Sequence, residues 1–225
     1  MTAALAQTRW FAGVARAAAA SGIGGPRPSP LVAVLCTEPR RRVAAAGVAL
    51  ALAPHGGCAL AGAVGEGLVA SIGGTPRARR VARSVRERGV AAAASGRLVW
   101  LADRRGPQAP EDVVGRAAAM SAELGRLATF VGVPAAVALP FARTPALDRV
   151  LAWHDAIIVV REPDAPAAML ERALASLAEL GRPVAAMAPP PRLPGVLAVG
   201  GLRAPAEALG AIAELNLGSG SSRDA

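Results

Sequence analysis

Lysine is absent from this chain, and all 25 of its basic residues are arginines. The absence excludes Schiff-base catalysis, a lysine general base and any phosphate loop that relies on a lysine ammonium group. Cysteine is scarce as well, with Cys36 and Cys58 as its two occurrences. Two isolated cysteines form neither a disulfide framework nor a metal site, so we expect buried, reduced thiols.

Aromatic residues are almost as rare, since the chain has no Tyr, 3 Phe and 3 Trp among its 225 residues. Alanine supplies 56 positions, so the hydrophobic fraction of 53% overstates the number of large apolar side chains. A chain of this length buries enough surface to fold without disulfides or metal. The composition therefore predicts a closely packed aliphatic core, and it gives no reason to expect a cofactor or a metal ion.

The chain reads as one main domain with short additions at its ends. We expect a helix over residues 1–21, a Gly- and Pro-rich linker over 22–30, a single α/β domain over 31–217 and a disordered tail over 218–225. The charge-free stretch 43–65 is long enough to span a bilayer, but Pro54 and two glycines interrupt it near the middle. A helix followed by a strand explains it better, and the first residues lack a secretory pattern. We therefore expect a cytoplasmic protein with no transmembrane span.

Strand-length apolar runs alternate with helical patterns along the domain. The predicted strands are 31–36, 58–64, 90–94, 98–102, 134–139, 156–160, 184–188 and 196–199. The predicted helices are 40–53, a helix from Pro76 to residue 88, 110–130, 145–154, a helix capped by Asp164 that runs to residue 180, and 205–215. This alternation predicts an α/β fold with a mostly parallel sheet and helices on both faces.

The loop after the first strand is the natural place for a ligand, because open α/β sheets bind ligands beyond the carboxyl ends of their strands. It contains Thr37, Glu38 and Pro39, followed by Arg40, Arg41 and Arg42. A phosphate loop places glycines here, then Lys and a hydroxyl for magnesium. Pro39 lacks an amide donor, and Glu38 repels phosphate. The loop therefore favours a function other than nucleotide binding, although arginine forks hold anions in some proteins.

Residues 134–182 contain an apolar strand, a helix, the strand Ala156–Val160 directly after Asp155, and a further helix. This segment resembles the Walker B strand and the following strand of the ParA/MinD class of deviant P-loop ATPases. Among the members of that class are pilus-localisation relatives and members that have lost catalysis. The resemblance implies a P-loop NTPase-like fold, with the nucleotide site at Thr37, Arg40, Arg41, Arg42, Ala138 and Arg143.

The departures from this family are as informative as the likeness. The acidic Walker B position falls near Ala138, whose methyl group cannot hold a metal through water, and the signature lysines have no counterpart. The resemblance therefore implies a non-catalytic pseudo-ATPase that keeps the scaffold and acts as an interaction or regulatory module. Its partner would be a protein: a true ATPase, a homologue, a second copy or part of a localisation or secretion apparatus.

Two other readings stay open. Gly65 and Gly67 fit a G-x-G-x-x-A fingerprint after a strand, which favours a nucleotide- or dinucleotide-binding enzyme. The segment 77–88 holds six Arg and one Glu, and so more than half of the formal net charge of +9. Its apolar residues share one helical face, which leaves a ridge of Arg79, Arg80, Arg83 and Arg86 for a partner or, weakly and non-specifically, for nucleic acid.

Overall fold

The computed structural model describes residues 29–36, 41–53, 57–64, 76–88, 92–95, 98–101, 113–140, 144–161 and 166–187. The strands are β1 (Leu31–Cys36), β2 (Ala59–Ala63), β3 (Ala92–Ser95), β4 (Leu98–Leu101), β5 (Ala135–Pro140), β6 (Ala156–Val160) and β7 (Val184–Met187). The helices are α2 (Arg41–Leu52), α3 (Pro76–Glu87), α4 (Val113–Val131), α5 (Pro145–Leu151) and α6 (Ala167–Ala178). The predicted elements at 1–21, 196–199 and 205–215 and the tail at 218–225 lie outside these ranges.

The strands form one seven-stranded sheet in the order β3-β4-β2-β5-β1-β6-β7. Six of them are parallel, and β3 pairs antiparallel with β4 at one edge. The predicted α/β class with a mostly parallel sheet is confirmed. An antiparallel strand at the edge is common in such sheets, because a short hairpin adds it without a crossover.

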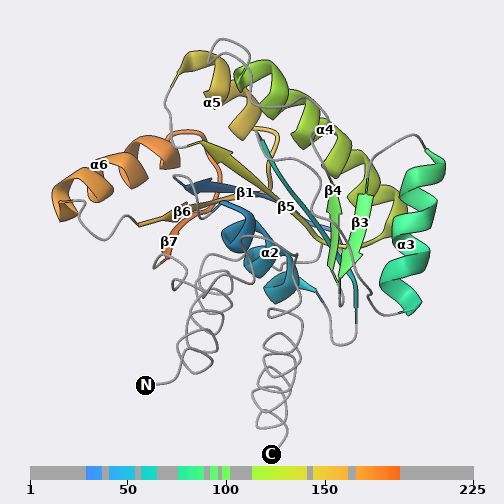
Figure 1. The fold of residues 1–225 in the computed structure, drawn as a ribbon. Helices are drawn as coiled ribbons and strands as arrows, with labels where there is room; N and C mark the ends of the chain where they lie inside the picture. Colours follow the sequence, from blue (N-terminus) through green and yellow to red (C-terminus); the bar gives the residue numbers. More distant parts are fainter. Residues whose placement is uncertain are drawn as a thin grey trace, which may run out of the picture.

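Helices cover both faces of the sheet (Figure 1), as the sequence predicts. The connection from β1 to β2 runs in one direction along the sheet, and those from β4 to β5, β5 to β6 and β6 to β7 run in the other. Because parallel crossovers are right-handed, the two directions place their helices on opposite faces. Accordingly α2 packs on one face, and α4, α5 and α6 pack on the other. α3 also packs on this second face, but its connection leads from β2 to the antiparallel strand β3, to which the rule does not apply.

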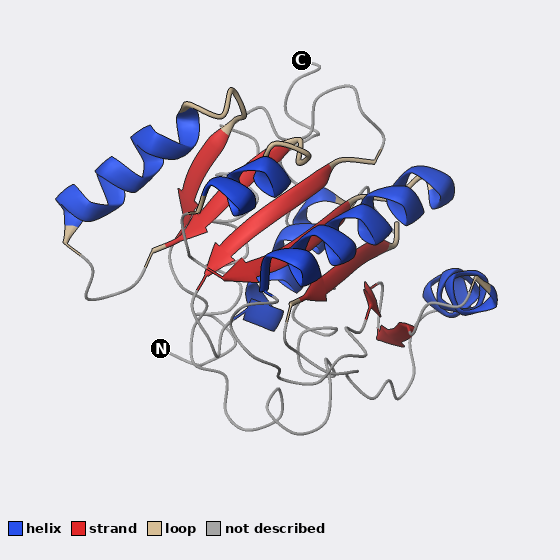
Figure 2. Ribbon diagram, turned by 90° about the horizontal axis from the view of Figure 1, so that it is seen from above, coloured by secondary structure: helices blue, strands red, loops and turns tan. Residues whose placement is uncertain are grey.

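Figure 2 views the same layers from above, with α4 and α5 in front of the strands and α3 and α6 at the two edges of the sheet. The central strand β1 is buried along its whole length, with Val32 and Val34 facing α2 and Ala33 and Leu35 facing the other layer. A strand buried on both faces needs a continuous apolar sequence, which is the pattern that marked it in the chain.

Close packing between the sheet and its helices depends on small residues. Gly62 of β2 lies under α4, where an added Cβ atom would be 3.0 Å from Met120 Sδ and 3.3 Å from the carbonyl oxygen of Leu101. On the other face, Ala44, Ala45 and several further alanines line the contact between α2 and the sheet. The high alanine content is therefore a property of the core, where it lets backbones approach.

The two cysteines are buried, as predicted, and they lie in different layers. Cys36 belongs to the cluster under α2, and Cys58 belongs to the cluster on the opposite face of the sheet. The sheet therefore separates the two thiols. None of the helices in the ranges given above is long and apolar enough to cross a membrane, and α2 and β2 occupy most of the charge-free stretch 43–65.

Three predicted helix boundaries are off by two residues or more, among them the end of the helix expected to run to residue 180, which ends at Ala178. The helix predicted over 145–154 ends at Leu151, where the backbone bonds tighten from four residues back to three: Trp153 N–H donates to the carbonyl oxygen of Val150 and His154 N–H to that of Leu151. The last described helix starts at Ala167 with Pro166 at its N-cap, not at Asp164. A proline disfavours the helical region for the residue that precedes it, which favours a helix start after Pro166 over one after Asp164.

Candidate functional site

The carboxyl ends of β1, β5 and β6 form the candidate ligand edge of the sheet. Cys36, Pro140 and Val160 are the last residues of these strands, and β1 lies between the other two. The connection after β1 leads to α2 on one face, whereas those after β5 and β6 lead to α5 and α6 on the other. This divergence is the topological switch point where open α/β sheets bind ligands.

The residues that the sequence assigns to a degenerate nucleotide site lie partly at this edge. Arg41 and Arg42 are the first two residues of α2, directly after the segment that follows β1. Ala138 lies in β5, opposite Val34 of β1 and Ala63 of β2. The other predicted positions, Thr37, Arg40 and Arg143, lie outside the described residues.

Among the described residues, Ala138 lies in an apolar cluster. The residue is fully buried in the cluster under α2, beside Val34 and Ala63. Its methyl group offers no oxygen to a metal ion or to a water molecule. In the described ranges, no three His, Cys, Asp or Glu side chains are placed to hold a metal ion.

Two arginines that the sequence analysis did not select lie near the same edge. Arg161 follows β6 directly, is exposed, and donates its backbone N–H to the carbonyl oxygen of Met187 at 2.8 Å. Arg116 lies in the first turns of α4, is 3% exposed and has an interaction partner. Its position directly after a strand could have identified Arg161. Nothing in the sequence marks Arg116 as buried, because its burial depends on how α4 docks.

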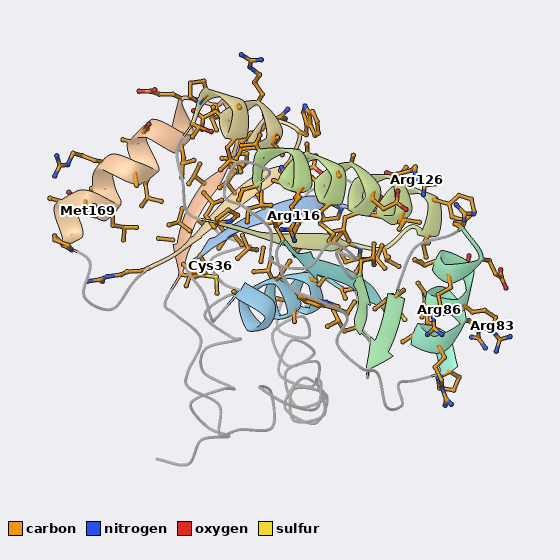
Figure 3. All side chains as sticks on the ribbon, turned by 45° about the horizontal axis from the view of Figure 1, so that its top comes forward. Cys36, Arg83, Arg86, Arg116, Arg126 and Met169 are labelled. Atoms are coloured by element: carbon orange, nitrogen blue, oxygen red, sulfur yellow. The ribbon has the colours of Figure 1, made fainter. Side chains whose placement is uncertain are left out.

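The predicted arginine ridge is present on α3. Ala78, Ala82 and Val85 are fully buried against the sheet, and Val81 packs beside them. The four arginines of the ridge, Arg79, Arg80, Arg83 and Arg86, are all exposed. Figure 3 labels Arg83 and Arg86 on α3. The helical periodicity therefore separated the buried and exposed faces of this helix correctly.

The end of α3 meets the end of α4 through a cation–π contact. The Arg88 guanidinium lies 3.0 Å from the centre of the Phe130 ring, and Phe130 is 60% exposed. One turn earlier on α4, Arg126 donates to Glu123 at 2.6 Å, and this contact raises the pKa of the guanidinium. Arginines thus gather around an exposed aromatic ring. The sequence analysis missed Phe130 because 42 residues separate it from Arg88.

His154 and Asp155 have structural roles at the opposite edge of the sheet. The Asp155 carboxylate accepts the backbone N–H of Leu31 at 2.9 Å, and the Asp155 backbone N–H donates to the carbonyl oxygen of Leu31 at 2.8 Å. The Arg182 guanidinium donates to the carbonyl oxygen of Ala152 at 2.7 Å. The two Asp155 bonds tie the turn before β6 to β1, and the Arg182 bond ties the same turn to the segment before β7. His154 is fully buried in this turn, with its imidazole Nδ1 3.1 Å from the carbonyl oxygen of Val150.

Comparison with known proteins adds no relative: no protein-family model, no curated protein and no solved structure matches the chain. The function is therefore inferred from the residues and from the geometry around them.

Proposed function

We propose that this chain is a non-catalytic scaffold of the ParA/MinD type, a pseudo-ATPase that serves as an interaction or regulatory module. The observation that carries the proposal is the pairing of β1 with β5, which sets Ala138 opposite Val34. In an active P-loop enzyme the position of Ala138 holds an acid, beside the strand that leads into the phosphate loop. Here the corresponding residue is a buried alanine.

The strand arrangement supports the scaffold part of the proposal. A P-loop site needs its phosphate-binding segment and its magnesium-holding acid on neighbouring strands, so that both reach the same phosphates. β1 and β5 are neighbours with a register of six residue pairs, and α2 begins shortly after β1. This neighbouring pair of strands supports the proposal that the chain keeps the scaffold of such a site with changed chemical groups.

The chemistry of these positions supports the loss of catalysis. Phosphoryl transfer depends on cations that neutralise the developing charge and on a positioned magnesium ion. The chain has no lysine for this role. Arg41 and Arg42 are the first two residues of α2. The helix dipole disfavours positive charge at a helix N-terminus, so these positions are unfavourable for the cations of a phosphate loop. A scaffold without its metal site retains surfaces for binding other proteins.

Nucleotide binding is the direct test. Fluorescent ATP and ADP analogues are titrated with purified protein, with and without magnesium, and MgATP turnover is measured in parallel. We expect no saturable binding at millimolar nucleotide and no turnover above the background rate. The matched variants are an alanine triple of Arg40, Arg41 and Arg42 and an alanine pair of the distant Arg149 and Arg172. Neither set should change these results.

Two outcomes would contradict the proposal. Turnover that the Arg40, Arg41 and Arg42 triple variant abolishes would mean that arginines have replaced the lysine of an active phosphate loop. A dinucleotide that copurifies with the protein would instead favour the enzyme reading built on Gly65 and Gly67. Both glycines lie outside the described residues.

A further inference from the structure

We propose that the arginine ridge of α3 binds the phosphate backbone of a nucleic-acid duplex, without selecting a base sequence. The ridge consists of Arg79, Arg80, Arg83 and Arg86, all of which are exposed. α3 packs against β3 and β4 at one edge of the sheet, whereas the candidate nucleotide site lies at β1 and β5. The inference therefore does not depend on whether nucleotide binds.

The four arginines of the ridge occupy one face of the helix. At about 100° per residue, they fall within about 120° of the helix circumference. Arg79 and Arg86, at the two ends of the ridge, are roughly 10 Å apart along the axis at about 1.5 Å per residue. Figure 3 shows Arg83 and Arg86 on α3 at one end of the molecule. Arg88 follows the helix and contacts Phe130, so it is not part of the ridge.

The positive charge of the ridge is uncompensated within the part of the chain that the structure describes. No carboxylate there pairs with the four arginines, whereas Arg126 of α4 pairs with Glu123. Glu87, the one acidic residue of α3, is exposed directly after Arg86. Like charges three and four residues apart on a helix repel each other. A ligand that carries many negative charges offsets this repulsion at several arginines at once.

A duplex supplies phosphates densely enough for every arginine of the ridge. Double-stranded DNA carries one negative charge per about 1.7 Å of its axis, so a length of roughly 10 Å presents about six phosphates. The arginine fork binds phosphate oxygens through two parallel hydrogen bonds. Contacts to phosphates carry no information about the bases, so the binding is non-specific.

The residues of the ridge face favour a nucleic acid over a protein partner. From Arg79 to Arg86 every exposed residue is an arginine, and Val81 is half-buried. Protein interfaces have an apolar core that is depleted of charged residues, and the ridge offers no exposed apolar side chain for such a core. A phosphate backbone is bound through its charge and needs no apolar contact.

Membranes and single-stranded nucleic acids fit the ridge less well than a duplex does. Helices that bind a membrane surface insert an apolar face into it. The apolar face of α3 is fully buried against the sheet through Ala78, Ala82 and Val85. Proteins that bind single strands stack the bases on aromatic side chains, and residues 79–86 include no aromatic residue.

The salt dependence of duplex binding tests the proposal. Fluorescence anisotropy measures the affinity of the full chain for a DNA duplex of about 20 base pairs over a range of salt concentrations. Each phosphate contact contributes about −0.9 to the slope of log affinity against log salt concentration, so four contacts give about −3.6. The variant R83Q/R86Q removes two contacts. Its slope should flatten to about −1.8, and its affinity at about 0.1 M salt should fall at least about tenfold.

The matched control is R149Q/R172Q, which removes the same net charge from α5 and α6. Its slope should stay within about 0.5 of the parent value and its affinity within about twofold. Gln forms helices about as readily as Arg, and circular dichroism checks that both variants are folded. An unchanged slope in R83Q/R86Q, or equal flattening in the control, would overturn the proposal.

Two competing ligands are titrated in parallel with the duplex. One is a vesicle that contains phosphatidylserine, and the other is a synthetic helical peptide with glutamates three and four residues apart. We expect both to bind at least about tenfold more weakly than the duplex at the same salt concentration. Tighter binding of the vesicle would assign the ridge to a membrane surface, and tighter binding of the peptide would assign it to an acidic protein. Either result would overturn the proposal.

Discussion

His154 lies buried in the turn between α5 and β6, where its imidazole is surrounded by protein. Burial lowers its pKa to about 4, and nearby backbone carbonyls and Asp155 oppose the shift without cancelling it. The ring is therefore neutral at pH 7. Nδ1 lies 3.1 Å from the carbonyl oxygen of Val150, and Nε2 has no hydrogen-bond partner in the described part of the chain. A proton added at Nε2 would be a buried charge without compensation.

The stability of the fold should depend on this ring below neutral pH. In the unfolded chain the imidazole takes up a proton near its ordinary pKa of 6.5, whereas in the folded protein it does so near pH 4. The unfolded state thus binds more protons between these values, and folding stability falls as the pH falls. The loss reaches on the order of 3 kcal/mol by pH 4. Urea unfolding at several pH values measures it.

The variant His154→Gln isolates this contribution. Its amide retains a donor for the Val150 carbonyl oxygen but does not titrate, so its stability should change less with pH than that of the parent. The carboxylates titrate in both proteins and cancel in the comparison. Parallel pH profiles for the two proteins would contradict the neutral, buried imidazole described above.

At the scale of single elements, α5 shows how local signals set a helix start. Thr144 is extended, with φ of −137°, and its hydroxyl accepts the backbone N–H of Leu147 at 3.1 Å. Pro145 follows at the first helical position, where its missing N–H costs nothing. The sequence predicted a helix start at residue 145, and the structure confirms it. Its end was predicted three residues too late, because the tightening of the backbone into a turn at Trp153 and His154 has no marker in the sequence.

Removal of the Thr144 cap should destabilise the protein measurably. Thr144→Ala leaves the amide of Leu147 without its acceptor and should lower the free energy of unfolding by about 1 kcal/mol. Thr144→Ser keeps the hydroxyl and should cost less than half as much. Denaturant titrations of the three proteins measure both differences. Equal losses in the two variants would show that packing of the threonine methyl group, and not the cap, stabilises this turn.

For α6, the sequence identified the glycine that follows the helix but not the residue at which the helix starts. Gly181 has φ of +68°, in the left-handed region that glycine favours, and the sequence identified it as the stop after α6. Asp164 was expected to cap the same helix, but Pro166 moves the start to Ala167. The steric effect of the nearby proline, and not the general preference for Asp at N-caps, therefore determines where this helix starts.

For the molecule as a whole, burial decreases from the centre of the sheet toward its edges. β1 and β5 are bonded on both sides and buried along nearly their whole length, whereas β7 has one bonded neighbour and exposes Ala186. Regions with few buried contacts open more often than the core does. We therefore expect local unfolding of the sheet to be most frequent at the edge strands and least frequent at the central strands.

Hydrogen–deuterium exchange tests this gradient. The amides of β1 and β5 should exchange at least about tenfold more slowly than those of β3 and β7 under native conditions. Exchange rates at two pH values establish that they report opening equilibria. Equal protection across all seven strands would mean that the sheet opens as one cooperative unit, without separate edges.

The sequence by itself determined the α/β class, the course of nearly every described element and the two faces of α3. These properties depend on the local spacing of apolar and charged residues, which can be recognised directly in the amino-acid sequence. Tertiary structure alone decided the strand order, the place of β1 between β5 and β6, and the contact of Arg88 with Phe130. Leu31 and Asp155, 124 residues apart, are joined in the same way. The buried strands share similar Ala- and Val-rich sequences, so no local pattern specifies which pair together, and packing of the whole molecule selects the partners.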